Sequence, residues 1–491
     1  MQPLLLLLLT CTNQVLGQNP AIKVILANKG LQYGSHVGTD WLHEKILSMN
    51  VPDVTGGVKV GVGTVRYVLD RMSVSQCDVP EPSVNFSEGN QVKTVINGLS
   101  IALRGNWHTK FSFMSDRGSF ELAVFNLDLT SLVELGSDDK GHLSILSKTC
   151  SAGIGKAEIN FHGGASWIFK PFVKFFKNRV KALIETQICP IVDEHIADVE
   201  QHLTNMQVSY RINCALVLEI PLINPPHINS SDLGLDLKGE FYNFESPKEP
   251  PFKALAFDLP RADGFMLSLG MSEFSFNSAA YAYYAAGQLH ITVTDKMIPP
   301  TSPLRLNTSS FGPFIPQLPK FFPNMLMELE VYARETPMFS FLPDEMSLKV
   351  PGAIKAVAIQ PNGTRAPLFK LNADGLFSGQ VYISEGKLRG LMKLKNFTLT
   401  LESSEIGTFQ TAALENGMKM AMTIAVLTPL NAKLKEGIPL PSIHDILLVN
   451  SVLKIQQGFV SIASDLEVSS PLRGHFEEGF VCPYKTSGAY L

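Results

Sequence analysis

A proline-rich segment at the midpoint of the chain, residues 239–252, separates two halves that repeat one order of sequence patterns. The segment reads Gly-Glu-Phe-Tyr-Asn-Phe-Glu-Ser-Pro-Lys-Glu-Pro-Pro-Phe, and proline fixes φ, removes a backbone donor and favours extended linkers. Each flank carries short β segments, a helix, more β segments, a long amphipathic helix and closing β segments. A chain of 491 residues is too long for one ordinary core, so the repeated order predicts two large domains of similar design.

Charge is spread evenly over the two halves. Residues 1–240 hold 20 Lys and Arg against 23 Asp and Glu, and residues 241–491 hold 21 against 22. Neither half is therefore a cationic domain, and a nucleic acid is not expected as a partner. With 45 % hydrophobic and 18 % charged residues, the chain is expected to be globular and rather apolar.

The start of the chain predicts a secreted, extracellular protein. Residues 1–17 read as a signal peptide: the apolar run Leu4–Leu9 is too short to span a bilayer, and Val15 and Gly17 suit cleavage before Gln18, although no Lys or Arg precedes the run. No later segment reaches about 18 uninterrupted apolar residues, so we expect a soluble mature protein. Five Asn-x-Ser/Thr sequons agree with secretion and predict N-glycosylation. They are Asn85, Asn229, Asn307, Asn362 and Asn396.

Cysteine usage points to disulfides and away from metal. No Cys-x-x-Cys and no Cys/His spacing suited to zinc is present, so no metal site is predicted. The cysteines that remain after removal of the signal peptide are Cys77, Cys150, Cys189, Cys214 and Cys482. Their odd number requires at least one free or intermolecular thiol, which leaves a monomer and a disulfide-linked dimer open.

The first half reads as β structure framed by helices. Residues 39–47 predict a short helix capped by Thr39, and residues 58–133 predict strands. The clearest hairpin is 96–129, in which the apolar positions change register between Val124 and Phe125. Such a slip moves the apolar set to the other face unless the strand bulges or coils, so a curved sheet is predicted.

Each half also carries one long helical pattern. Residues 166–204 show a wide apolar face with lysines between, which favours a helix that plugs a barrel core over one that lies on a membrane surface. In the second half, residues 267–297 are expected to be rich in strands, 309–323 to form a short helical piece, and 325–401 to return to strands. Residues 410–436 predict the second long helix, whose methionines suit a core or a pliable lipid pocket.

No catalytic constellation is evident, so no catalytic residues are assigned and the protein is predicted not to be an enzyme. The sequence lacks a Gly-x-Ser-x-Gly elbow and a His-Glu-x-x-His motif. His195 and His202 lie seven residues apart on the first long helix, where an exposed or core-satisfied histidine is the expected role.

The order of parts resembles the bactericidal/permeability-increasing protein and lipopolysaccharide-binding protein family. The resemblance covers about residues 18–468. The segments that carry it are residues 30–33, 239–252, 295–299, 322–325 and 433–441. It implies an α+β fold of two similar elongated antiparallel β-barrels, each with a long amphipathic helix, joined by a central sheet and the Pro-rich linker into a boomerang.

The implied domains follow from that fold. Residues 18–240 form the N-terminal barrel, 241–254 the linker and 255–468 the C-terminal barrel, and 469–491 remain as a polar tail. The family also implies apolar pockets near the centre that hold phospholipid acyl chains, and no other cofactor. Its single disulfide joins the strand before the first long helix to that helix, which places it at Cys150 and Cys189.

The family binds the lipid A region of lipopolysaccharide with a basic, Trp-containing hairpin turn at the tip of the first domain. Residues 105–111 occupy that position here and contribute Trp107 and Lys110, flanked by Arg104 and Arg117. An indole ring can enter the acyl boundary while the cations meet phosphate. The family's strongest binders carry several more cations here, so potent bacterial killing is not expected of this turn.

Two functions therefore remain open. The first is a secreted innate-immune protein that binds lipopolysaccharide on the bacterial outer membrane surface and phospholipid in its pockets, with antimicrobial (antibiotic) or neutralising action. The alternative is an extracellular transfer protein for phospholipid or neutral lipid without an antibacterial role.

Overall fold

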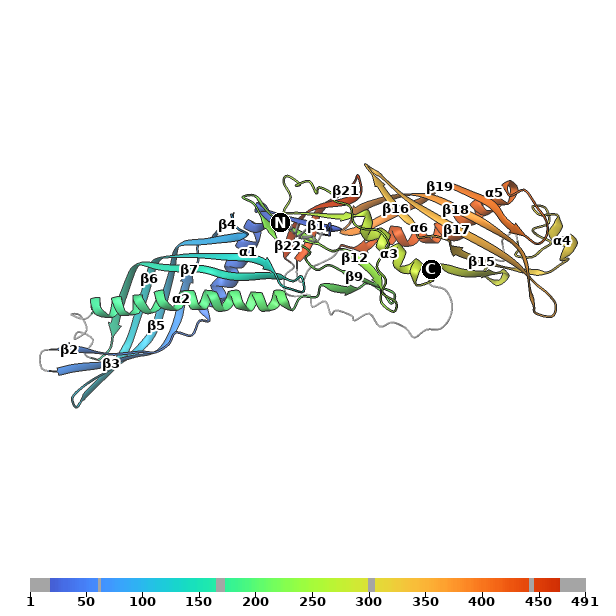
Figure 1. Ribbon diagram of the computed structural model, residues 1–491. Coiled ribbons are helices and arrows are strands. Elements are labelled where there is room, and N and C mark those ends of the chain that lie inside the picture. The colour runs from blue at the N-terminus through green and yellow to red at the C-terminus, as the bar shows by residue number, and fades with distance from the viewer. Residues whose placement is uncertain (1–17, 61–62, 165–172, 299–304, 441–445, 469–491) are drawn as a thin grey trace, which may run out of the picture.

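The computed structural model describes residues 18–60, 63–164, 173–298, 305–440 and 446–468. The predicted signal peptide, the polar tail with Cys482, and the first residues of the helix predicted over 166–204 lie outside the described residues. The molecule is elongated, with one large curved sheet at each end and two sheets of shorter strands between them (Figure 1). The predicted α+β fold with two similar halves is confirmed.

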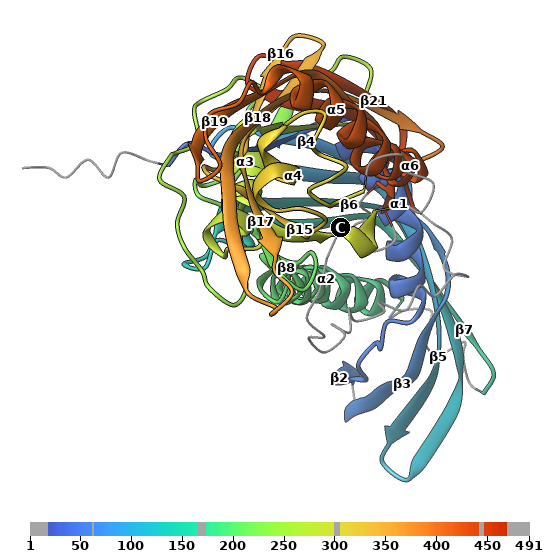
Figure 2. The ribbon, with the colours of Figure 1, turned by 90° about the vertical axis from the view of Figure 1, so that its right-hand side faces the viewer.

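The first half is built on a strongly curved antiparallel sheet. Its strands are β2 (Val54–Val60), β3 (Gly63–Asp78), β4 (Ser83–Ser87), β5 (Gln91–Phe111), β6 (Met114–Ser137) and β7 (Leu143–His162). They pair in the order β2-β3-β5-β6-β7, with β4 beside β5. The helices α1 (Asn28–Leu47) and α2 (Val173–Thr204) pack on the inner face of this sheet, as the end-on view shows (Figure 2).

The register slip predicted in the β5–β6 hairpin is confirmed. Phe120 and Val124 face the core, Phe125 turns outward with 38 % exposure, and Leu127 is buried again. The shift in inward-facing positions occurs at Asn126, which has a φ of 51°. This left-handed conformation is one that asparagine tolerates better than most residues. The slip keeps the apolar side inward while the strand coils.

Helix α1 corrects the prediction of a short helix capped by Thr39. The helix begins at Asn28, and the Thr39 hydroxyl donates to the Ser35 carbonyl oxygen inside it (3.0 Å). Glycines in this stretch lower helix propensity and hid the helix from sequence reasoning. One of them has a packing role, because a Cβ at Gly30 would lie 2.9 Å from the Met266 carbonyl oxygen of the second half.

The second half repeats the design. Its large sheet contains β14 (His290–Thr294), β15 (Leu326–Ala333), β16 (Met338–Leu342), β17 (Glu345–Ile359), β18 (Arg365–Ser384), β19 (Lys387–Ser404) and β20 (Ile438–Pro439). The order is β14-β15-β17-β18-β19-β20, with β16 beside β17. The predicted second long helix is confirmed as α5 (Ala412–Met422), the π-helical turn η3 (Thr423–Leu427) and α6 (Thr428–Glu436). The short α4 (Gln317–Phe321) lies in the predicted helical piece.

Helix α3 (Glu273–Ala285) corrects the strand-rich prediction for residues 267–297. Only β13 (Leu267–Ser272) and β14 are strands there, followed by the 3₁₀ turn η2 (Asp295–Met297). Ser275, Ser278 and Ala282 are buried at helical spacing. Ser278 accepts a hydrogen bond from the Phe241 backbone N–H (2.9 Å) and donates to the Ser275 carbonyl oxygen (2.8 Å). Tertiary packing of small residues therefore overrides the β propensity of the aromatic residues between them.

A central sheet joins the halves. It contains β10 (His227–Ile228), β11 (Asp232–Leu237), β1 (Ile22–Ala27), β13, β22 (Phe459–Val468) and β21 (Ile446–Gln456), in that order. β1 pairs with β11 of its own half and with β13 of the other half. A three-stranded sheet of β12 (Glu240–Asn243), β9 (Leu216–Glu219) and β8 (Ser209–Arg211) lies beside it. The predicted linker, 241–254, begins inside β12.

Candidate functional site

Trp107 lies in the core and not at an exposed tip, which corrects its predicted contact with lipid. It is 1 % exposed, and its indole Nε1–H donates to the His162 carbonyl oxygen (3.2 Å). Gly118 leaves room for the ring, because a Cβ there would lie 2.6 Å from Cε2 of the indole. From Leu99 to Trp107 the odd positions of β5 face inward, and the hairpin turns farther on, at Ser112 and Phe113.

The three predicted cations do lie on the outside. Arg104, Lys110 and Arg117 are exposed, and they come from the outward-facing positions of β5 and β6. The Arg104 guanidinium lies 3.7 Å from the Glu121 carboxylate. Arg104 is therefore paired with an acid, whereas Lys110 and Arg117 make no ion pair with a described residue.

Strand pairing collects further basic side chains around Lys110. Arg66 of β3 is the direct partner of Lys110, and His108 is the direct partner of Arg117. We call these four residues the basic face. Among them only the His108 side chain lies at ion-pair distance from a described acid, 3.2 Å from the Asp70 carboxylate. Like charges directly opposite on one sheet face destabilise a protein, so an anion bound between Arg66 and Lys110 would offset a cost to the fold. Sequence reasoning missed Arg66 and His108, because only the register brings them to the site.

The turn beyond the basic face is apolar and exposed. Phe113 is 90 % exposed and Met114 57 %. Hairpin turns normally carry polar residues, so an apolar pair there was a usable signal that sequence reasoning did not take up. Together with the basic face, this turn forms an amphiphilic tip at the distal end of the first half (Figure 1).

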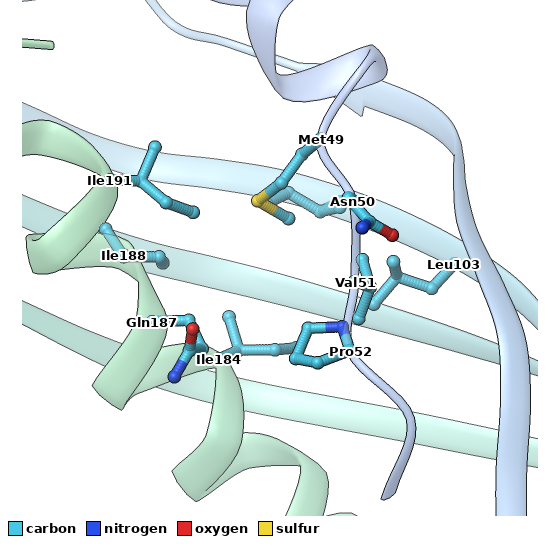
Figure 3. A pocket seen from close by; sticks show the side chains of 10 residues that line it. Met49, Asn50, Val51, Pro52, Leu103, Ile184, Gln187, Ile188 and Ile191 are labelled. Atoms are coloured by element: carbon cyan, nitrogen blue, oxygen red, sulfur yellow. The ribbon is translucent and has the colours of Figure 1, made fainter. Parts of the chain in front are cut away.

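A small apolar pocket lies between α2, β5 and the segment that follows α1 (Figure 3). Eight of its ten lining side chains are apolar. The lining residues are Met49, Asn50, Val51, Pro52, Ile101, Leu103, Ile184, Gln187, Ile188 and Ile191. Its volume is about 30 Å³, close to the share of one water molecule in the liquid. An acyl chain would therefore enter only if α2 and its neighbours moved apart.

A second apolar pocket occupies the equivalent place in the other half, between the large sheet and α5. Its lining includes Leu414 and Met418, two residues of the predicted Met-bearing helix. The rest of the lining consists of Phe311, Leu329, Ile354, Phe369 and Leu371. The volume is about 10 Å³, so an acyl chain would enter this pocket too only if its walls moved apart.

The disulfide Cys150–Cys189 is confirmed and ties β7 to α2 across 39 residues. Cys77 is a buried free thiol. Burial, with a smaller contribution from the Asp78 charge, raises the pKa of Cys77 to about 11, so this thiol is protonated and unreactive at neutral pH.

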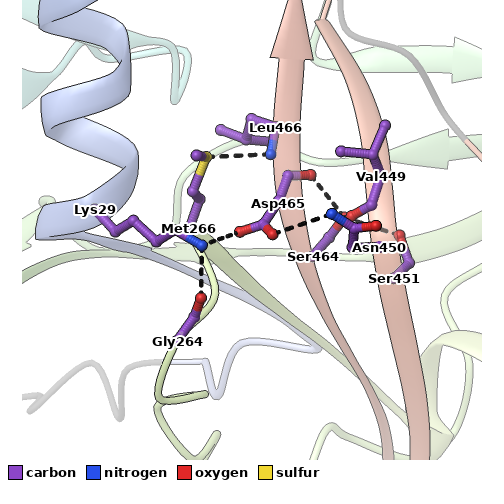
Figure 4. Close-up of polar contacts among 9 residues, drawn as sticks. All are labelled: Lys29, Gly264, Met266, Val449, Asn450, Ser451, Ser464, Asp465 and Leu466. Carbon is purple, nitrogen blue, oxygen red and sulfur yellow. Dashed lines mark hydrogen bonds and ion pairs between the residues drawn. The ribbon is translucent and has the colours of Figure 1, made fainter.

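A polar joint at the other end of α1 ties the two halves together (Figure 4). Lys29 donates to the Gly264 carbonyl oxygen and to Asp465 Oδ1, both at 2.7 Å. The hydrogen bond from Lys29 lowers the pKa of Asp465 below its ordinary value, despite the opposing effect of burial. One turn farther along α1, Tyr33 Oη accepts from the Val468 N–H (3.0 Å). α1 therefore links the central sheet to the segment that lines the first pocket.

Other predicted positions can also be located. Among the described residues, no group of three His, Cys, Asp or Glu could hold a metal ion. His195 and His202 both contact Asp198, through its carboxylate (3.5 Å) and its carbonyl oxygen (2.7 Å) respectively. Of the sequon asparagines, Asn307 is half-buried and the others are exposed. No helix in the described ranges is both long and apolar enough to cross a membrane.

Comparison with known proteins agrees with this architecture. Residues 30–206 match the N-terminal domain of the LBP / BPI / CETP family, and residues 211–468 match the C-terminal domain. The bactericidal permeability-increasing protein of Sebastes schlegelii is 36 % identical over 451 residues, which cover 91 % of this chain and 95 % of that protein. The human lipopolysaccharide-binding protein is 28 % identical over 466 residues, covering 94 % and 97 % respectively.

A solved structure shows the same fold. The crystal structure of lipopolysaccharide binding protein superposes with a TM-score of 0.61 at 24 % identity, covering 92 % of this chain and 100 % of that chain. With both halves matched in order and a relative above 30 % identity along nearly its whole length, the chain belongs to the LBP / BPI / CETP family.

Proposed function

We propose that this chain is a secreted innate-immune protein that binds lipopolysaccharide at its amphiphilic tip and carries phospholipid in its apolar pockets. The observation that carries the proposal is the direct pairing of Arg66 with Lys110, beside Arg117, without an acidic partner among the described residues. The diphosphorylated headgroup of lipid A supplies the missing negative charge. Phe113 supplies an apolar contact at the edge of its acyl chains.

The names of the relatives support this assignment, since they are a lipopolysaccharide-binding protein and a bactericidal permeability-increasing protein. The signal-like start of the chain, the exposed sequons and the disulfide support secretion. The tip has few cations, which favours neutralisation or presentation of lipopolysaccharide over potent killing.

Titration with lipopolysaccharide tests the tip. Arg66→Ala with Lys110→Ala should weaken binding and reduce its dependence on salt, because exposed charges are screened beyond about 8 Å at physiological ionic strength. Phe113→Ala should weaken binding through lost apolar burial of up to roughly 1.5–3 kcal/mol. Arg104→Ala is the matched control, since Arg104 is exposed on the same face but already paired with Glu121. If the double variant, Phe113→Ala and Arg104→Ala all had equally small effects on affinity, lipopolysaccharide would not bind at the tip.

An alternative, lipid transfer without an antibacterial role, is favoured by the apolar pocket in each half. Titration with phosphatidylcholine beside lipopolysaccharide separates the two functions. Incubation with a labelled phospholipid separates both from a lipase, because a carrier returns intact lipid and a lipase releases fatty acid. Organic extraction of the purified protein should yield co-purified phospholipid, and repeated absence of lipid would contradict the carrier role.

A further inference from the structure

One side of α2 is fastened to β7 at four points along its length. Glu185 Oε1 accepts a hydrogen bond from the Ile154 N–H (2.9 Å). Cys189 is bonded to Cys150. Asp193 accepts from the Ser147 hydroxyl (2.6 Å), and Glu200 accepts from the Ile145 N–H. We call Glu185, Cys189, Asp193 and Glu200 the hinge side of α2.

β7 is the last strand of its sheet, so its outer backbone groups lack a strand partner. The carboxylates of Glu185 and Glu200 accept from two of these groups, the Ile154 and Ile145 N–H, which would otherwise depend on water. Hydrogen bonds to charged groups are stronger than neutral ones, and a covalent bond lies among them. This side of α2 is therefore the harder one to detach.

The opposite side of α2 faces the segment 49–52 across the first pocket (Figure 3). Ile184 points towards Pro52, and Met49 extends towards Ile191. None of the polar groups of residues 49–52 is hydrogen-bonded to α2 within the described part of the chain. Apolar contact alone holds this seam, which we call the portal.

The segment at the portal is itself fixed. It follows α1 directly, and α1 is held at its start by Lys29, which bonds Gly264 and Asp465. Asn50 also forms a β-bridge to Ser73. When the two sides of the portal separate, α2 is therefore the element that moves.

We propose that α2 pivots about β7 as a hinged lid and opens the portal so that a phospholipid acyl chain enters between α2 and residues 49–52. This inference rests on the proposed carriage of phospholipid. Opening exposes apolar surface that the acyl chain covers again, while the four fastenings on β7 stay intact. The two polar side chains of the pocket, Asn50 and Gln187, are neutral amides, so a zwitterionic phosphatidylcholine is the suitable probe.

Two engineered disulfides, one on each side of α2, test the pivot. Pro52→Cys with Ile184→Cys closes the portal. Ser147→Cys with Asp193→Cys replaces an existing contact on the hinge side and is the matched control. The readout is the uptake rate of a fluorescent phosphatidylcholine from phosphatidylcholine vesicles, with each single cysteine variant measured alongside. The portal disulfide should stop uptake, and the hinge disulfide should leave the wild-type rate.

A variant without a new disulfide tests the same proposal if the Pro52→Cys, Ile184→Cys protein does not fold. Met49→Ala removes apolar contact at the portal and should speed uptake roughly fourfold or more, since one buried CH₂ corresponds to about that factor in a rate. Slowing by both disulfides, or by neither, would overturn the hinged lid while leaving carriage of lipid intact. A wild-type protein that takes up no phosphatidylcholine would overturn the proposed carriage and the portal with it.

Discussion

The two halves fasten their long helices to a sheet edge in the same way but with different chemistry. In the first half, carboxylates and a disulfide join α2 to β7. In the second half, Glu415 accepts from the Leu399 N–H (3.0 Å) of β19, and Asn431 both accepts from and donates to the backbone of Met392 (2.7 and 2.9 Å). Both helices therefore satisfy backbone groups that the sheet leaves open, which is a requirement of the fold.

The difference lies in how firmly each helix is held and how it is built. Cys150–Cys189 is covalent, whereas no disulfide ties α5 or α6 to β19 in the described residues. The second helix also contains the π-helical turn η3, where the helix is locally rewound. The firmer fastening belongs to the half with the proposed portal, as expected if one side of α2 must hold while the other opens.

The largest expected effect compares two buried aromatic residues, one in each half. Trp107 and Phe397 are each 1 % exposed, so Trp107→Ala and Phe397→Ala should each cost about 3–5 kcal/mol of unfolding free energy. Hydrogen exchange read by region should locate the loosening in the half that carries the change. A stable Trp107→Ala protein that has lost lipopolysaccharide binding would instead return Trp107 to the tip.

Removal of the disulfide should destabilise the first half and leave the second half unchanged. Cys150→Ser with Cys189→Ser should lower the unfolding free energy by roughly 3–4 kcal/mol, because the unfolded chain regains the freedom of a long loop. Secreted yield should fall, and exchange should rise along α2 but not along α5. Peptide mapping without reductant provides the control, since Cys150 joined to Cys77 or Cys214 would contradict the pairing.

A smaller effect should appear with pH in the second half. Hydrogen bonds from Lys419 and from the Leu399 N–H hold the pKa of Glu415 below its ordinary value of 4.5. A lowered folded-state pKa stabilises above the unfolded value and loses that contribution as pH falls through the folded one. Denaturation between about pH 6 and pH 3 should therefore show a loss that is smaller in Glu415→Gln. If the pH dependence of the unfolding free energy were unchanged in that variant, Glu415 would not contribute to holding α5 against β19.

Much of the fold could be predicted because apolar periodicity reports burial directly. The slip between Val124 and Phe125 and the helix over 410–436 followed from pattern alone, and the disulfide followed from the family resemblance. α1 and α3 were misread because Gly30 and Ser278 allow close contact with Met266 and Phe241, residues distant from them in the sequence, which propensity does not describe.

At the tip, too, local sequence patterns predict burial, whereas contacts between distant strands cannot be predicted from them. The inward series Leu99, Ile101 and Leu103 continues through Gly105 to Trp107, so the burial of Trp107 was readable from the sequence. The place of Arg66 beside Lys110 could not be read from the sequence, because Arg66 lies more than 40 residues earlier and only the β3–β5 register brings the two together. The domain boundaries and the use of the sequons remain predictions.

The place of β1 has a consequence for how the chain is made. β1 is among the first segments to leave the ribosome, yet one of its edges, residues 22–26, pairs with β13 of the second half. Until β13 has been synthesised, that edge is open to any other strand, including β1 of a neighbouring nascent chain. The charge of Lys23 on β1 disfavours such cross-pairing, and a fragment truncated before β13 would carry the open edge permanently.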